Sequence, residues 1–379
     1  MIDAMGSEKF TRFESTATSK ILNFAAGPGM MPTAVLAQAQ REFLSWNGSG
    51  LSMLEMPFTG EEFKGILRQA REALRALLNI PDGYHILFMH GGASAQFSLV
   101  PLNLLGRARL ANHIETGYWS CKSIREASRY CGINIAASSA GTHFDRMPET
   151  WHLDAHAAYC HLTSNETANG VQFHTIPDTG DLPLVADMTS DFLSKPVDVQ
   201  RYGLIYAGAQ KNIGPAGLTV VIVRNDLLGG AHPSTPAVFN YQVQAEADSM
   251  FNTPITFAVY LTGLVLRWIM DMGGVAEMER RSVQRSARIY DVIDASDGFY
   301  RCPVQPAHRS RMNICFTLAD EAITPRFLSV AATQGLVNLK GHAMSGGIRA
   351  SLYNAMPDEG VAALANFMRQ FSVEYGCHV

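Results

Sequence analysis

Lys211 is a candidate nucleophile because of the residues on either side of it. An apolar run over 203–208 precedes it, and two glycines and a proline follow it over 214–217. This pattern predicts a short buried strand and then a tight turn, which together deliver one amine into a cleft. Apolar surroundings favour the neutral form of a lysine, and a neutral amine can form a Schiff base with an aldehyde. A lysine at the start of a surface loop is the commoner arrangement, so the assignment depends on a second signal.

That second signal is a carboxylate at the end of another apolar strand. Residues 183–186 are apolar, and Asp187 follows them directly. A strand-end aspartate and a strand-end lysine form the pair that holds pyridoxal 5'-phosphate (PLP). The lysine binds C4′ of the cofactor, and the aspartate keeps the pyridine nitrogen protonated so that the ring can accept electrons. The two residues therefore predict a PLP site.

A glycine-rich turn and a tryptophan add weaker signals for the same site. Gly91 and Gly92 follow a predicted strand and precede Ala93 and Ser94 at the start of a helix. Small residues let backbone N–H groups approach a phosphate, and the amino end of a helix favours an anion. Trp119 follows another predicted strand, and its flat ring could stack on a cofactor. Glycine-rich turns and core tryptophans are both common, so these signals gain weight only beside the lysine and the aspartate.

The composition limits the classes of protein to consider. The chain has 379 residues, which favours two domains, and 47% of them are apolar, enough for a large core. Charged residues make up only 17%, below the usual quarter, which is a weak sign of surface hidden in an oligomer. The net charge of −4 is spread along the chain without a basic stripe, so nucleic acid is not an expected partner.

Neither a metal site nor a membrane segment is expected. The six cysteines lack metal-ligand spacing, and no carboxylate motif accompanies His152, His156 and His161, so structural roles are favoured for these histidines. No apolar run approaches the roughly 18–20 residues needed to span a bilayer. The first twenty residues are polar and mixed in charge, without the apolar core of a signal peptide, so we expect a cytoplasmic location.

Strands and helices are predicted to alternate through the middle of the chain. Apolar spacing predicts a helix over 61–79. Strands are predicted by the apolar runs at 85–89, 108–114, 157–163, 184–187, 204–208 and 218–223. Such alternation predicts an α/β fold with a largely parallel sheet between helices, whose sites lie at the carboxyl ends of the strands. Lys211, Asp187, Ser94 and Thr167 follow predicted strand ends, so we expect them to converge.

The pattern of elements changes near Gly274. A charged helix over 275–295 is followed by a strand over 312–317, a helix over 325–334 and a strand over 347–353. This order predicts a second, smaller α+β domain.

Seven segments of the chain resemble the phosphoserine aminotransferase family. They are 23–28, 117–119, 165–167, 207–217, 250–254, 309–313 and 349–355. The stretch centred on Lys211 is the most specific, and the similarity runs from about residue 21 to the end of the chain. The resemblance implies a class V, fold-type I PLP enzyme that works as a homodimer. It also implies a large domain around a mostly parallel seven-stranded sheet, over 35–273, and a smaller α+β domain made of 1–34 and 274–379.

The resemblance implies a role for each matching residue. Lys211 is similar to the family's Schiff-base lysine, Asp187 to the partner of the pyridine nitrogen, and Trp119 to the aromatic residue stacked on the ring. Thr167 matches the residue bonded to the phenolic oxygen of the cofactor, and Arg349 matches the arginine that binds the α-carboxylate of the substrate. The positions that match the cofactor-phosphate site are Ala93, Ser94, Thr189, Gln210 and, supplied across the dimer, Asn252 and Thr253.

The chain departs from the family in the predicted pocket for the substrate side chain. The family carries His-Arg where this chain has Phe58 and Thr59, and an arginine where Ala343 follows His342. Some members also carry an arginine in place of Ser94. A phosphate without guanidinium partners loses charge-assisted bonds, each worth about 1.5–3 kcal/mol. The substrate pocket, with Phe58, Thr59 and His342 beyond the carboxylate-binding arginine, is therefore expected to be less positive than the family's.

We therefore expect a PLP-dependent aminotransferase that moves an amino group between an L-amino acid and a small 2-oxo acid. The absence of the family's arginines favours an acid related to 3-phosphohydroxypyruvate but without its phosphate, unless Lys340, His342 or another nearby base binds the phosphate in their place. Two alternatives are the family reaction itself, with glutamate and phosphohydroxypyruvate in serine biosynthesis, and another class V reaction such as that of a lyase or desulfurase. A protein that only binds a ligand is disfavoured because Lys211 and Asp187 are both present.

Overall fold

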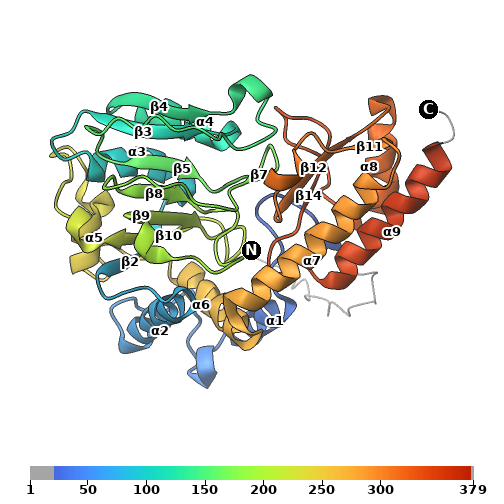
Figure 1. Cartoon of the computed structure of the whole chain (residues 1–379). Helices are drawn as coiled ribbons and strands as arrows, with labels where there is room; N and C mark the ends of the chain where they lie inside the picture. The colour runs from blue at the N-terminus through green and yellow to red at the C-terminus, as the bar shows by residue number, and fades with distance from the viewer. Residues whose placement is uncertain (1–20, 377–379) are drawn as a thin grey trace, which may run out of the picture.

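A seven-stranded sheet forms the centre of the larger part of the molecule (Figure 1). The computed structural model describes residues 21–376, so the expectation of no signal peptide, which concerns residues 1–20, lies outside the described part. The strand order is β2-β10-β9-β8-β5-β3-β4. These strands are β2 (Tyr84–His90), β3 (Leu110–Glu115), β4 (Gly132–Ser138), β5 (Cys160–Thr163), β8 (Leu184–Asp187), β9 (Leu204–Gly208) and β10 (Leu218–Arg224). Only β10 runs antiparallel to its neighbours, so the predicted mostly parallel α/β sheet is confirmed.

Alternate residues of the strands enter two different cores, one on each face of this sheet. In β10, Val220 and Ile222 join the core formed with α2 (Glu61–Leu78) and α6 (Thr256–Asp271). Val221 and Val223 face the opposite way, into the core formed with α3 (Gly92–Leu104). A strand buried on both faces needs apolar residues at every position, which explains the continuous apolar runs that predicted these strands.

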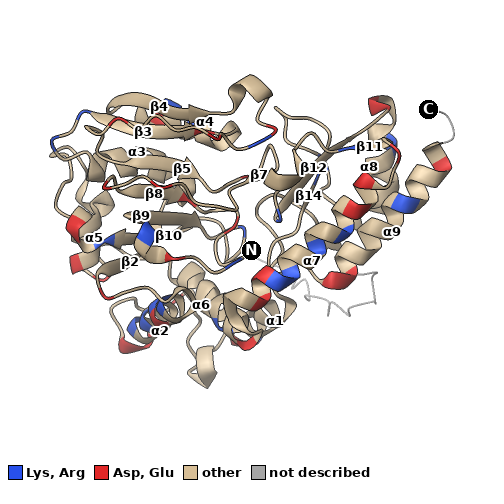
Figure 2. Ribbon diagram, viewed as in Figure 1, with Lys and Arg blue, Asp and Glu red and all other residues tan. Residues whose placement is uncertain are grey.

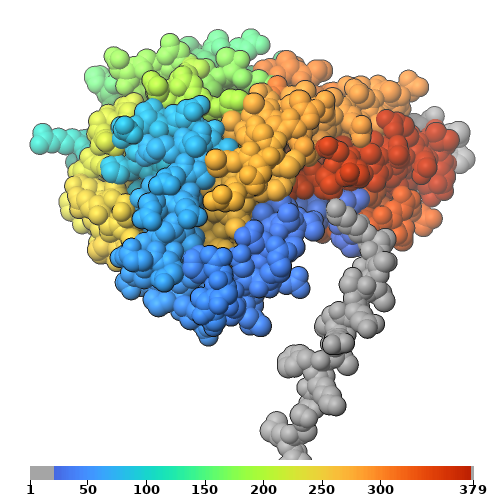
Figure 3. All heavy atoms as spheres, turned by 90° about the horizontal axis from the view of Figure 1, so that it is seen from below, coloured from blue at the N-terminus to red at the C-terminus, as the bar shows by residue number. Residues whose placement is uncertain are grey.

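Helices α1 (Thr33–Glu42) and α2 both contact α6, which packs against one face of the sheet. Seen from below, the blue N-terminal part of the chain lies beside the yellow-orange segments on the surface of the molecule (Figure 3). On the other side, α4 (Tyr118–Ala127) packs beside α3, and α5 (Tyr241–Glu246) lies near β2. Charged residues of both signs occur along α2 and along α7 (Gly274–Asp294), which is the longest of the described helices (Figure 2). No single helix within 21–376 is long and apolar enough to cross a membrane; α6 and α7 reach the required length and composition only as a pair bent by 80°.

The C-terminal part of the chain builds a smaller α+β unit beside the sheet (Figure 1). Its antiparallel sheet consists of β11 (Tyr300–Arg301), β12 (Asn313–Leu318) and β14 (Ile348–Ser351), in that order. Phe24 of the N-terminal segment lies in its core, and β1 (Leu22–Asn23) pairs with β13 (Leu336–Val337). The predicted domain boundaries, 35–273 and 1–34 with 274–379, stay a prediction, and residues 1–20 and 377–379 of the smaller domain lie outside the described part. The helices α8 (Thr324–Thr333) and α9 (Asp358–Tyr375) complete this unit, and a separate antiparallel pair is formed by β6 (Asn165–Glu166) and β7 (Val171–Gln172).

Candidate active site

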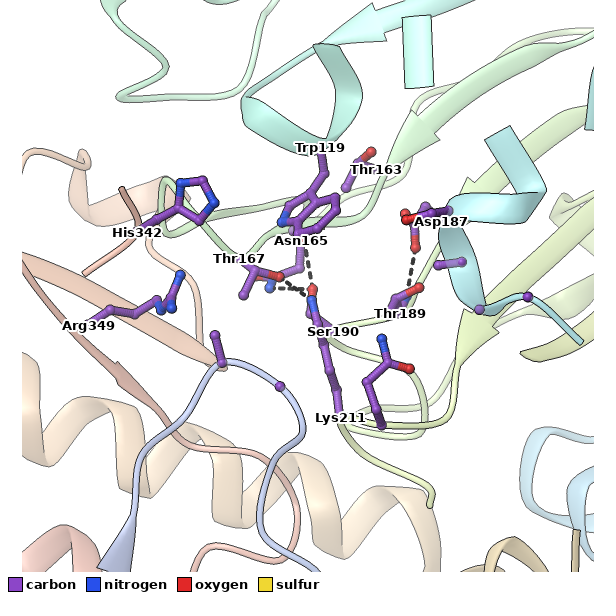
Figure 4. Close-up of a pocket in the computed structure, with 17 residues that line it drawn as sticks. Trp119, Thr163, Asn165, Thr167, Asp187, Thr189, Ser190, Lys211, His342 and Arg349 are labelled. Atoms are coloured by element: carbon purple, nitrogen blue, oxygen red, sulfur yellow. Dashed lines mark hydrogen bonds between the residues drawn. The ribbon is translucent and has the colours of Figure 1, made fainter. Parts of the chain in front are cut away.

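A cavity of about 320 Å³ opens at the carboxyl ends of the central strands (Figure 4). Its volume falls within the range of roughly 300–1,000 Å³ that is usual for small-molecule sites. Ten of the predicted site residues line it: Ala93, Ser94, Trp119, Thr167, Asp187, Thr189, Gln210, Lys211, His342 and Arg349. The convergence expected from the strand ends is therefore present in the fold.

Lys211 enters the cavity from the turn that follows β9. Its side chain is buried, and Nζ donates a hydrogen bond to Oγ1 of Thr167 at 2.5 Å. Burial lowers the pKa of Lys211 to about 8, against the opposing charge of Asp187. The turn behind the lysine requires glycine, because a Cβ at Gly214 would lie 2.3 Å from Oγ1 of Thr262 on α6. The amine is thus fixed in place by packing and is partly neutral near physiological pH.

Asp187 is the last residue of β8 and lies at the opposite end of the cavity from Arg349 (Figure 4). Its carboxylate is buried, and Oδ1 accepts a hydrogen bond from the backbone N–H of Thr189 at 2.9 Å. Burial raises the pKa of Asp187, while hydrogen bonds from Thr189 and the charge of Lys211 act in the lowering direction. A cationic ligand atom at this end of the cavity would be bound by the ionised carboxylate.

The turn between β2 and α3 offers backbone donors. Gly91 precedes α3 with a φ of 96°, and a Cβ there would lie 2.6 Å from the Cβ of Ala95, so glycine is required. No side chain of the described residues caps this helix, which leaves N–H groups of its first turn, around Ala93 and Ser94, free for an anion. Gln210 lies nearby with a buried Oε1 that lacks a partner within 21–376. This end of the cavity suits a phosphate.

Trp119 is positioned by a carboxylate that sequence analysis missed. Oε2 of Glu166 accepts from the backbone N–H of Trp119 at 2.9 Å, and Oε1 accepts from that of Ser120 at 2.8 Å. Glycine is required at position 117, where a Cβ would lie 2.7 Å from Cδ of Glu166. These contacts start α4 at Tyr118. Burial raises the pKa of Glu166 to about 7, against the lowering effect of the same backbone donors.

Arg349 and His342 lie together at the end of the cavity away from Asp187 (Figure 4). Arg349 comes from β14 and His342 from the loop before that strand. Nε of Arg349 is buried and has no hydrogen-bond partner in the described part of the chain. Burial lowers the pKa of His342, and the charges of Arg349 and Lys122 lower it further. The guanidinium is therefore the stronger anion-binding group at this end.

Four predicted site residues lie outside the cavity of this chain. Phe58 packs against the core of the larger part, and Thr59 is exposed beside it. Oδ1 of Asn252 accepts from Nε2 of Gln244 at 3.1 Å, and the carbonyl oxygen of Thr253 lies 3.1 Å from Nε2 of His90. The predicted roles of these four residues are not met within one chain.

Three further polar residues line the cavity and were not predicted from the sequence: Thr163, Asn165 and Ser190. Nδ2 of Asn165 donates to Oγ of Ser190 at 2.8 Å and to Oδ1 of Asn313 at 2.8 Å. These bonds connect the larger sheet to β12 of the smaller unit. Thr163 is the last residue of β5 and Ser190 comes three residues after β8, so their place at strand ends was a signal that could have identified them.

His161 is a core residue, as its predicted structural role requires. Its ring stacks on His113 with centroids 4.9 Å apart, and Nε2 lies 2.9 Å from the hydroxyl of Tyr206. Burial lowers the pKa of His161 to about 3. Among residues 21–376, no group of three His, Cys, Asp or Glu side chains is arranged to hold a metal ion.

The donor set of the cavity fits PLP. A lysine amine, a carboxylate at one end and free backbone N–H groups beside it correspond to the aldehyde, the pyridine nitrogen and the phosphate of that cofactor. Four buried polar atoms of cavity residues lack a partner within the described range: Nε1 of Trp119, Oγ1 of Thr163, Oε1 of Gln210 and Nε of Arg349. Buried polar groups are rarely left unpaired, so these atoms indicate that the cavity receives polar ligands.

Comparison with known proteins places the chain in a family. Residues 21–364 match the model of the aminotransferase class-V family. The phosphoserine aminotransferase of Laribacter hongkongensis is 52% identical over 358 residues, which cover 94% of this chain and 99% of that protein. The phosphoserine aminotransferase of Chromobacterium violaceum is 51% identical over 361 residues, which cover 94% of this chain and all of that protein.

Solved structures give the same result. Phosphoserine aminotransferase from Bacillus circulans subsp. alkalophilus superposes with a TM-score of 0.92 at 43% identity, over 94% of this chain and 99% of the other. The PLP-bound phosphoserine aminotransferase of Trichomonas vaginalis superposes with a TM-score of 0.88 at 37% identity, over 92% of this chain and all of the other. The chain therefore belongs to the phosphoserine aminotransferase family of class-V aminotransferases and is a PLP-dependent transaminase.

Proposed function

We propose that this transaminase carries out the phosphoserine aminotransferase reaction, in which phosphoserine and 2-oxoglutarate are interconverted with phosphohydroxypyruvate and glutamate. The observation that carries the enzymatic part is the placement of the buried Lys211 amine between Asp187 at one end of the cavity and Arg349 at the other (Figure 4). The names of relatives about half identical over 94% of the chain support the substrate.

This choice replaces the substrate that sequence analysis favoured. The missing arginines at Thr59 and Ala343 suggested an acid without a phosphate. That substrate has no support from the comparisons, whereas the alternative drawn from the family reaction does. The phosphate must then be bound by groups other than those two arginines.

PLP supplies an aldehyde that condenses with the substrate amine and a ring that accepts the electrons released at Cα. In this chain, Lys211 would hold the cofactor covalently, Asp187 would bind the pyridine nitrogen, and Trp119 would cover one face of the ring. Thr167 would bind the phenolic oxygen. The phosphate would lie among Ala93, Ser94, Thr189 and Gln210, where the first turn of α3 adds free N–H groups.

Lys211 is the group in the cavity suited to proton transfer. Its pKa of about 8 lies close to physiological pH, so Nζ can both accept a proton from the substrate Cα and donate it again. Arg349 would orient the substrate by binding its α-carboxylate through two parallel N–H donors. Since Nε of Arg349 lacks a partner among the described residues, the guanidinium has a free donor for this purpose.

A homodimer is the proposed assembly, because Asn252 and Thr253 lie outside the cavity of their own chain. Several large apolar side chains are exposed on the monomer: 79% of Leu44, 57% of Leu54 and 50% of Phe251. Apolar surface of this kind is typical of contacts between subunits. Phe251 is adjacent in sequence to the two residues that would serve the partner's cofactor.

The reaction is tested by giving the purified PLP-loaded protein 2-oxoglutarate with either O-phospho-L-serine or L-serine. Both products, the new 2-oxo acid and glutamate, are quantified by mass spectrometry. We expect kcat/KM for phosphoserine to exceed that for serine by about 10-fold or more, because one charge-assisted contact to the phosphate contributes on the order of that factor. A preference for serine, or the absence of glutamate with both donors, would contradict the proposed reaction.

A further inference from the structure

A second cavity adjoins the proposed active site. It has a volume of about 590 Å³ and lies beyond the Tyr118–His342 contact, whose ring centroids are 4.3 Å apart. Two pairs of chain neighbours divide between the cavities: Trp119 and Thr167 line the first, whereas Tyr118 and Ala168 line the second. On the loop before β14, His342 lines the first cavity and Met344, two residues later, lines the second. The two cavities are thus separated by a wall of single side chains at the end that holds Arg349.

Lys122 is a cation that lines this second cavity. It lies one turn after Trp119 on α4, is half-buried, and forms no ion pair or hydrogen bond with any residue of 21–376. Its Nζ lies 5.0 Å from the ring centroid of Trp119 and 5.7 Å from that of Tyr118. The ammonium is therefore held against the aromatic wall between the two cavities.

The charges of the two cavities leave one anionic group of the substrate unmatched. A substrate with an α-carboxylate and a distal phosphate or carboxylate needs a cation at each end. In the first cavity the cations are Lys211, which serves the cofactor, and Arg349, which is assigned to the α-carboxylate. His342 is largely neutral at physiological pH because its pKa is lowered.

Other sources of positive charge near this wall are less suitable. The amino end of α4 is already occupied, because Asn169 and the Glu166 carboxylate accept from its first backbone N–H groups. Arg125 also lines the second cavity, but it is exposed and stands three residues, roughly 4.5 Å, beyond Lys122 along the helix, on the side away from Trp119. Lys122 is therefore closer than Arg125 to the aromatic wall between the two cavities.

We propose that Lys122, with His342 as a neutral hydrogen-bonding neighbour, binds the distal anionic group of the substrate in place of the arginines absent at Thr59 and Ala343. The ligand class is a small acid that bears a phosphate, or in the second half-reaction a carboxylate, at the end opposite its α-carboxylate. Because the ammonium is anchored on aromatic faces rather than paired with an acid, its charge is available to that group. The proposal rests on the proposed function and assigns the contact that the family's arginines would otherwise make.

The test measures binding rather than turnover. The PLP-loaded protein is titrated calorimetrically with ligands that have no amino or keto group: 3-phosphoglycerate against glycerate, and 2-hydroxyglutarate against 2-hydroxybutyrate. The variants are Lys122→Met, Lys122→Arg and, as a control that removes an equal charge on α2, Lys64→Met. We expect Lys122→Met to weaken binding of 3-phosphoglycerate on the order of 10-fold or more and glycerate less than about 2-fold. Lys122→Arg and Lys64→Met should bind both nearly as the native protein does.

Two results overturn the proposal. In the first, Lys122→Met weakens binding of both ligands of each pair equally; in the second, it weakens binding of neither. Correct folding of the variant is checked by PLP absorbance and by the behaviour of Lys122→Arg. A loss confined to the dicarboxylate pair keeps Lys122 as the anion site and counts against the phosphorylated substrate. If Lys122→Met leaves binding intact while the native protein still transaminates phosphoserine, the proposed function stands and the assignment of Lys122 fails.

Discussion

Nζ of Lys211 and Oγ1 of Thr167 are joined by a hydrogen bond of 2.5 Å across the cavity. Lys211 lies in the turn after β9 of the central sheet, and Thr167 follows the short strand β6 (Asn165–Glu166), which pairs with β7 outside that sheet. The threonine accepts from the lysine ammonium and so favours its charged form, whereas burial favours the neutral one. The balance leaves an amine that can change protonation state near physiological pH.

Lys211→Ala is expected to abolish transamination and covalent attachment of PLP, because no other lysine lines the cavity within the described chain. Borohydride reduction of the native protein followed by peptide mapping should find the cofactor on Lys211. Lys64→Ala, which removes an exposed lysine paired with Glu61, serves as the control and should keep full labelling. Labelling of a different lysine would contradict the assignment.

Attachment of PLP to the cofactor-free protein should accelerate as pH rises through about 8. The neutral amine is the nucleophile, and its fraction grows as the pH passes the lowered pKa of Lys211. Thr167→Val removes an acceptor from the ammonium, so the midpoint of the rate profile should shift to lower pH. Stopped-flow absorbance across pH 6–10 measures both profiles, in a range of roughly two units on either side of that pKa. A native midpoint near the ordinary lysine value would mean that the amine is not desolvated.

Asp187→Ala should keep some PLP but lose most activity, on the order of 100-fold, equivalent to about 2.7 kcal/mol of transition-state stabilisation. The buried carboxylate is the acid at that end of the cavity, and without it the ring is a poor electron sink. Asp187→Glu retains the charge and is the matched control. Steady-state rates at saturating PLP decide; near-native rates for Asp187→Ala would assign the role to another acid.

The sequence predicted those parts of the site that local pattern determines. Lys211 and Asp187 could be placed because each follows an apolar run long enough for a buried strand, and parallel strands bring their carboxyl ends to one edge. The carboxylate of Glu166 at the start of α4 could not be predicted, since it acts through backbone groups 46 and 47 residues away along the chain. Lys122 gave no signal either, because its meaning depends on the two cavities and the aromatic wall between them.

If Asn252 and Thr253 serve the partner's cofactor, each active site is built from two chains. Hybrids of inactive Lys211→Ala with an inactive Asn252→Ala/Thr253→Ala double variant would then contain one doubly defective site and one intact site. Activity should therefore return after subunit exchange, to roughly a quarter of the native value when equal amounts are mixed and half of the dimers are hybrids. Differently tagged chains allow the hybrids to be isolated. Hybrids without activity would place both residues in the site of their own chain.

Restoring the arginine absent at Ala343 should strengthen selection for phosphorylated substrates. Ala343 is exposed next to His342, so a guanidinium can be accommodated without displacing core residues. We expect Ala343→Arg to raise kcat/KM for phosphoserine relative to serine on the order of 10-fold, because a charge-assisted bond to the phosphate is gained only with that substrate. Ala343→Gln, similar in length but uncharged, is the control, and steady-state kinetics with both donors give the ratio. An unchanged ratio in Ala343→Arg would show that the phosphate does not approach this loop.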